Sequence, residues 1–219
     1  MDNIHEALTV LETFERQGLT QRIANLEYLM AMKNGSALNK VLEQENVTPE
    51  LLKAAFTVKK AASQIDVVVH AAGIMVALPY ILKEGEIVES LALGAGNTGR
   101  KFDLETNFRV AEFKFINWQG GSESIRQNQL FKDLFGLAVD SSGKEKYLYL
   151  VGKDIPMKFL TNSRRSLASV LSKNIEMRNS FYKTYGDKYQ YVSQYFRDIE
   201  NQIRVIDLKD LVPALQDIG

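Results

Sequence analysis

Apolar positions in the first part of the chain recur every three or four residues, which is the period of an α-helix. Ile4, Leu8 and Leu11 form one such stripe. Pro49 marks a further helix start, because proline is favoured in the first turn of a helix. We therefore expect an N-terminal helical lobe over residues 1–62, and its residues have no spacing typical of a catalytic site.

The pattern between residues 63 and 152 predicts a mixture of helices and strands. A long, mostly apolar helix is expected from Ser63 to Leu82. The segments that follow are predicted in this order: a strand over 86–93, a strand over 102–106, a strand over 109–117, a helix from Ser122 or Ser124 to Ala138, and a strand over 146–151. The order of elements is thus helix, strand, strand, strand, helix, strand, and we expect an α+β (α/β) core.

The remaining residues, 153–219, are expected to form a C-terminal helical extension. Polar helices are predicted over 163–174 and roughly over 175–203, and a short apolar piece over 205–218 follows. The predicted organisation is therefore a helical lobe, a mixed core and a helical extension.

Composition narrows the class of protein. The 219 residues include 27 Lys and Arg against 27 Asp and Glu, so the net charge is zero, which argues against a protein that coats nucleic acid by global attraction. There is no cysteine, so disulfides and thiolate metal sites are excluded. The apolar stretch 65–82 contains Asp66, His70 and Pro79, and we interpret it as a buried helix and not as a membrane span. We expect a soluble, cytoplasmic protein that does not interact with membranes.

The segment 102–115 carries the most informative polar pattern. Side chains alternate between the two faces of a strand, so Glu112 and Lys114 point the same way, whereas Ala111 and Phe113 point to the opposite, core-facing side. Placing an acid and a base between apolar residues in mid-strand is costly unless they line a cleft or pair with other groups. This pattern favours a functional site on one face of the strand.

Asp103 is expected beside that site. A turn near Asn107 would pair the two strands of a hairpin about that point and bring Asp103 within reach of Glu112. Two carboxylates at the edge of a sheet form a hard-oxygen site suited to Mg²⁺, or to Mn²⁺. A lysine beside them can orient or deprotonate a water molecule and offset phosphate charge.

The element order and these three residues resemble the PD-(D/E)XK nuclease superfamily, whose fold is the three-layer restriction-endonuclease-like core. The resemblance implies that Asp103 and Glu112 bind the divalent metal together with the backbone carbonyl of Phe113. It implies that Lys114 assists the attacking water. The family also implies a further acid upstream, for which Glu89 is the first candidate and Glu86 the second.

A polar residue from the following helix often supports the site in this family, and Gln127 or Gln129 fits that place. A second Asp-x-Lys sequence, Asp207-Leu208-Lys209, is discounted because no helix and strand follow it. His70 is interpreted as a packed histidine within its apolar helix.

The glycines of the segment 94–99 spell G-x-G-x-x-G after a strand. A dinucleotide-binding fingerprint would require a helix there, so we reject it and expect a hairpin tip that approaches a nucleic-acid backbone, with Arg100 and Lys101 next in the chain. Between residues 153 and 204 there are ten basic and five acidic residues, an excess of five. Arg164 and Arg165 are candidate phosphate contacts, although an ordinary solvated helix face explains the same excess.

These observations predict a Mg²⁺-dependent DNA endonuclease of the restriction or phage-defence type, acting as a homodimer because one site per chain cuts one strand. Two alternatives stay open. The chain is equally compatible with a nuclease that acts on RNA, and a non-catalytic α+β binding or assembly protein would explain the same elements without metal binding between Asp103 and Glu112.

Overall fold

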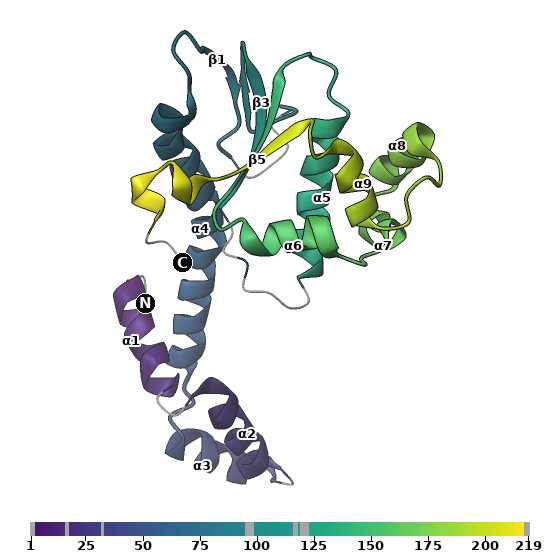
Figure 1. Ribbon diagram of the computed structural model, residues 1–219. Coiled ribbons are helices and arrows are strands. Elements are labelled where there is room, and N and C mark those ends of the chain that lie inside the picture. The colour runs from purple at the N-terminus through teal and green to yellow at the C-terminus, as the bar shows by residue number, and fades with distance from the viewer. Residues whose placement is uncertain are drawn as a thin grey trace. The chain divides into compact units, whose positions relative to one another are not determined.

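The computed structural model describes residues 3–15, 18–31, 33–94, 99–115, 118 and 123–216 (Figure 1). The chain divides into two compact units, Met1–Val68 and Val69–Gly219. The first unit consists of helices α1 (Ile4–Glu15), α2 (Leu19–Met30), α3 (Gly35–Gln44) and the beginning of α4 (Pro49–Ile81). The N-terminal lobe is thus helical, as the apolar spacing predicts.

Local side chains set where these helices begin. The side chain of Asn34 accepts a hydrogen bond from the backbone N–H of Ala37 and caps α3. Thr48 accepts one from the N–H of Leu51 at 3.3 Å, directly before the proline that opens α4.

Helix α4 is continuous over 33 residues, although the sequence indicates two helices that meet near residue 62. In length and composition it would suffice to cross a membrane, and only 17% of its most apolar window is buried. The expectation of a buried helix holds for one face only, because Ile74, Ala77 and Ile81 are buried while Met75 and Tyr80 are half exposed.

The second unit is built around a five-stranded mixed sheet. Its strands are β1 (Val88–Leu91), β2 (Leu104–Thr106), β3 (Arg109–Lys114), β4 (Glu145–Leu150) and β5 (Ile203–Asp207), in the spatial order β1-β2-β3-β4-β5. The first three strands form an antiparallel meander, and β4 and β5 continue the sheet in parallel with β3. The pairing therefore changes from antiparallel to parallel at β3.

The turn between β2 and β3 fixes the register of the hairpin. The hydroxyl of Thr106 accepts hydrogen bonds from the N–H groups of Phe108 and Arg109, at 3.1 and 2.9 Å. Leu104 then pairs with Ala111, so the next step along the register sets Asp103 against Glu112. The predicted hairpin geometry is confirmed.

Helices cover both faces of the sheet, which makes three layers in this unit (Figure 1). On one face, Ala111, Phe113 and Tyr149 pack against α4 and the segment after β5. On the other face, Val110 and Leu148 pack against α5 (Ser124–Ala138) and the helices that follow β4. The expected α+β class is confirmed.

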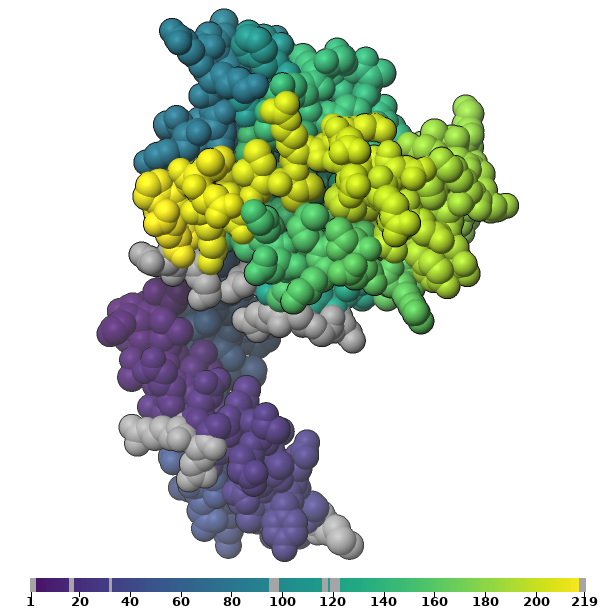
Figure 2. All heavy atoms as spheres, in the orientation of Figure 1, coloured from purple at the N-terminus to yellow at the C-terminus, as the bar shows by residue number. Residues whose placement is uncertain are grey.

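The residues 153–219, expected as an extension, lie in the same unit as the sheet. They form α6 (Asp154–Asn162), α7 (Leu167–Leu171), α8 (Ile175–Tyr185) and α9 (Val192–Ile199), followed by β5. Helix α6 packs against α9 (Figure 2). The predicted helix over 175–203 was wrong in extent, because Gly186, at φ 56°, ends α8 and residues 203–207 form a strand.

Candidate active site

An open cleft of about 430 Å³ lies between β3, the segment that leads into β2, and α5, and most of the predicted site residues line it. Asp103, Glu112, Lys114 and Gln129 are among its lining side chains. The structure therefore brings together residues that the sequence predicts for the site from the segment before β2, from β3 and from α5. The further polar and charged residues of the lining are His70, Arg100, Lys101, Lys132 and Asp133.

Asp103 is held from two sides. The backbone N–H of Phe113 donates to Oδ2 of Asp103 at 2.9 Å. The carboxylate thus takes the place of the backbone carbonyl that would accept this N–H if the β2–β3 pairing continued beyond Leu104. The Nε2 atom of His70 lies 3.4 Å from Oδ1 of Asp103. Burial opposes ionisation of Asp103, but these hydrogen bonds and the charge of Lys114 outweigh burial, so its pKa lies below its usual value.

Glu112 behaves in the opposite way. Burial, the negative charges of Asp133 and Asp103, and a hydrogen bond to the Asp103 carboxylate raise the pKa of Glu112 to about 9. In the metal-free protein Glu112 is thus protonated at neutral pH. The two facing carboxyl groups share a proton, as expected for like charges held close together in a partly buried site.

Lys114 is directed toward α5. Its Nζ atom lies 2.6 Å from Oδ2 of Asp133, and the side chains of Lys114 and Asp133 are only 15% and 7% exposed. The side-chain amide of Gln129 donates to Oδ1 of Asp133 at 3.3 Å. Burial lowers the pKa of Lys114, but Asp133 and Glu112 more than compensate, so its pKa is raised and the amine is charged.

The donor set fits a small hard cation. Asp103 and Glu112 offer carboxylate oxygens whose mutual repulsion a divalent cation would relieve, and its binding would displace the Glu112 proton. Within the part of the chain that the structure describes, no three His, Asp or Glu side chains converge on one metal position. The remaining ligands would be water and carbonyl oxygen, which is the coordination that Mg²⁺ favours.

The backbone at Phe113 is oriented suitably for that carbonyl. In an extended strand the N–H and C=O groups of one residue face the same neighbour. The N–H of Phe113 faces Asp103, whereas the carbonyl of Lys114 accepts from Val151 on the β4 side. We therefore expect the Phe113 carbonyl on the edge of β3 that carries Asp103, although the Phe113 ring is buried on the opposite face.

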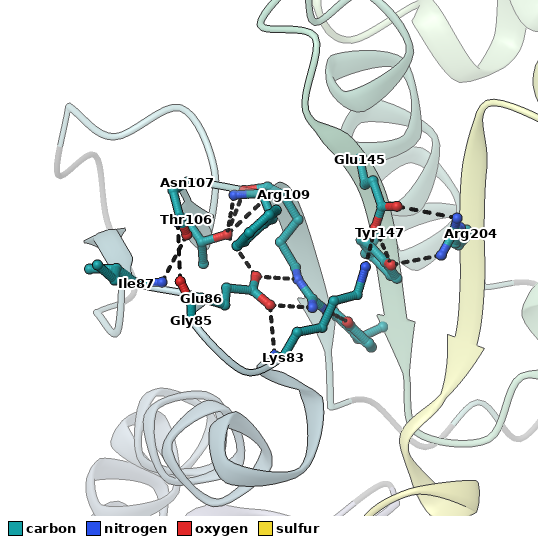
Figure 3. A network of polar contacts seen from close by, with 12 residues as sticks. Lys83, Gly85, Glu86, Ile87, Thr106, Asn107, Arg109, Glu145, Tyr147 and Arg204 are labelled. Carbon is teal, nitrogen blue, oxygen red and sulfur yellow. Dashed lines mark hydrogen bonds and ion pairs between the residues drawn. The ribbon is translucent and has the colours of Figure 1, made fainter.

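The candidate upstream acids lie outside the cleft lining. Glu89 is 47% exposed and pairs with Lys144 at 2.6 Å. Glu86 forms a fully buried ion pair with Arg109, in a polar network that also includes Thr106 and Tyr147 (Figure 3). Gln127 is likewise absent from the lining, so of the two glutamine candidates only Gln129 reaches the cleft.

The candidate nucleic-acid contacts divide into two groups. Arg100 and Lys101 line the cleft, where Arg100 donates to the carbonyl of Leu91 and Lys101 pairs with Asp140 at 2.5 Å. Arg164 is exposed and Arg165 is partly buried, and neither lines the cleft. Of the expected glycine-rich tip, residues 95–98 lie outside the described residues.

Two site residues escaped the sequence interpretation. Asp133 follows Gln129 by four residues, a spacing that places both on one helix face and was the available signal. His70 was interpreted as a packed histidine, but its side chain is 23% exposed and reaches Asp103.

The second Asp-x-Lys sequence has a structural role that explains its residues. The carboxylate of Asp207 accepts hydrogen bonds from the backbone N–H groups of Gly152, Lys153 and Lys209, at 2.8–3.1 Å. It thereby ties the end of β4 to the end of β5.

No family model matches this chain, and neither a curated protein nor a solved structure matches it significantly.

Proposed function

We propose that this protein is a Mg²⁺-dependent endonuclease that hydrolyses phosphodiester bonds in DNA, with a core of the PD-(D/E)XK type. The observation that carries the proposal is the meeting of Asp103, Glu112 and Lys114 in one cleft. The antiparallel meander, the crossover helix α5 and the parallel strand β4 support the same assignment, because they follow the element order that the family implies.

The roles follow from the geometry. Asp103 and Glu112 would hold the cation, with Asp103 fixed by the Phe113 N–H and by His70. Bound Mg²⁺ would supply positive charge for the phosphate oxygens and the attacking water. The ammonium of Lys114, on the same face of β3 as Glu112, would orient that water and offset phosphate charge. Lys132 and Arg100 add positive charge to the cleft that a phosphate backbone would contact.

Cleavage of plasmid DNA in the presence of Mg²⁺ tests the proposal. We expect Asp103→Ala and Lys114→Ala to abolish cleavage, and Glu89→Ala, which removes an acid outside the cleft, to preserve it. Retained cleavage in both cleft variants would overturn the site assignment. A parallel assay with single-stranded RNA of matched sequence decides between the two nucleic acids, and sedimentation with and without DNA tests the proposed homodimer.

A non-catalytic assembly protein is the second candidate, and the apolar surface of α4 favours it. Val69, Met75 and Tyr80 are each more than 40% exposed on this helix, as expected of a surface that binds another protein. This candidate predicts no Mg²⁺-dependent thermal shift, whereas a cation held by Asp103 and Glu112 stabilises the folded state.

A further inference from the structure

We infer that Asp133 is a positioning residue for Lys114 and that the site takes a single divalent cation. The inference rests on the proposed function and concerns which acids of the cleft would bind the cation and which acid holds Lys114. It starts from the three carboxyl groups that surround one lysine, of which Asp103 and Glu112 lie on the hairpin and Asp133 lies on α5.

Asp133 contacts protein groups through both carboxylate oxygens, and its contact to Lys114 is an ion pair without hydrogen-bond geometry. One carboxylate oxygen contacts the Lys114 ammonium at 2.6 Å, and the other accepts from Gln129 at 3.3 Å. A divalent ion bound at Oδ2 of Asp133 would lie beside the Lys114 ammonium, and repulsion between the two cations opposes metal binding there while the ion pair is intact. Breaking it would leave a buried ammonium without its partner, which is strongly unfavourable.

The ion pair also solves a problem of geometry. A lysine has a flexible four-carbon stem, and holding its ammonium at one position costs side-chain entropy. Asp133 comes from a helix that is anchored in the core by Leu130, Phe131 and Leu134, all nearly inaccessible to solvent. The rigid helix thus supplies an anchor that the strand itself lacks, and the ammonium is held ready beside the acid pair.

The charge arrangement points to one cation. Asp103 and Glu112 face each other across the hairpin, while Lys114 supplies fixed positive charge on the α5 side. A second divalent ion on that side would have to displace this ammonium. The Lys114–Asp133 pair therefore disfavours a second divalent ion on the α5 side of the acid pair.

Calorimetric titration with Mn²⁺ and steady-state cleavage together test the inference. We expect wild type to bind one Mn²⁺ per chain. Asp133→Asn keeps the shape of the side chain, so it should still bind one Mn²⁺, with less than about tenfold weaker affinity, while kcat falls about 100-fold at nearly constant KM. Asp133→Glu should fold normally and recover part of kcat, because it restores the charge partner at a shifted position.

The matched control is Asp103→Asn, which should lose Mn²⁺ binding. An equal loss of Mn²⁺ binding in Asp133→Asn, or two Mn²⁺ per wild-type chain, would overturn the inference.

A measurement that needs no catalysis separates this inference from the proposed function. Lys114 should resist an amine-reactive label in the wild-type protein, and Asp133→Asn should raise its labelling several-fold as detected by peptide mass spectrometry. If wild type cleaves no nucleic acid, the proposed function fails, while the labelling still decides the positioning role. Unchanged labelling of Lys114 would contradict that role.

Discussion

Asp103, the residue directly before β2, faces Glu112 on β3, one step along the register from Leu104 and Ala111. Folding raises the pKa of Glu112 from 4.5 to about 9. The folded protein therefore keeps a proton on this pair over a pH range in which the unfolded chain has already released it. Between these two pH values the folded state binds one proton more than the unfolded state. The contribution of Glu112 to stability is therefore lost as the pH rises.

We predict that the metal-free protein becomes less stable between pH 5 and pH 8, by up to about 1.4 kcal/mol per pH unit from Glu112 alone. Urea denaturation across this range measures the slope. Glu112→Gln should flatten it, because the amide does not titrate. A slope that is the same in wild type and Glu112→Gln would show that another group dominates.

The buried ion pair of Glu86 and Arg109 predicts a large effect on stability without a direct effect on the cleft. Their side chains are 0% and 2% exposed, and Arg109 also donates to the hydroxyl of Tyr149 at 2.6 Å. Glu86→Gln leaves the guanidinium without its counter-charge, and we expect a loss of about 3–5 kcal/mol in the free energy of unfolding.

The neighbouring acid Glu89 is the matched control. Its pair with Lys144 is solvated and screened, so Glu89→Gln should cost less than about 1 kcal/mol. Equal losses in the two variants, measured by denaturant unfolding, would mean that burial does not set the strength of these pairs.

Gly73 marks a close approach between α4 and the sheet. A Cβ atom at this position would lie 2.4 Å from the ring of Phe115, so one of the two must move. We predict that Gly73→Ala destabilises the protein by about 1–3 kcal/mol, as overpacking does. A Cβ atom added at Gly136 on α5 would meet no atom within 4 Å other than its own helix backbone. Because alanine favours a helix more than glycine does, Gly136→Ala should raise the free energy of unfolding by up to about 1 kcal/mol.

Thermal unfolding of the two glycine variants should therefore give shifts of opposite sign. A stabilised Gly73→Ala protein would show that the Phe115 ring has room to turn aside.

We predict that replacing Asp207 changes the stability of the protein but not its metal binding. Asp207→Ala leaves three backbone N–H groups at the ends of β4 and β5 without their acceptor, and we expect a loss of more than about 2 kcal/mol in stability. Mn²⁺ should still bind at 10 °C with wild-type stoichiometry. A loss of binding in the folded variant would connect this second Asp-x-Lys sequence to the metal site.

The strand-bound part of the site was predictable because strand chemistry is local. Alternation alone puts Glu112 and Lys114 on one face, and a turn near Asn107 fixes where Asp103 lies. Asp133 and His70 were not recognised, because their positions depend on how α5 and α4 pack on the sheet. The four-residue spacing from Gln129 places Asp133 on the same face of α5, but the sequence does not show that this face meets Lys114.

Strand β5 was missed for a related reason. Its apolar residues form a short run that is compatible with either a helix or a strand, and only the open edge of β4 selects the strand. The break at Gly186 was likewise hidden inside a run of polar and aromatic residues with helical spacing. Tertiary pairing decided β5, whereas the positive φ of Gly186 ended α8.

The position of β3 has a consequence for local unfolding. This strand pairs with β4 along its whole length and with β2 at Val110 and Ala111, and the Phe113 amide beyond that pairing is bonded to Asp103. Such a strand exchanges its amides with solvent only in the largest openings of a fold. Asp103 accepts one of these amides, that of Phe113, and fraying of the outer helices would therefore leave the acid pair in place.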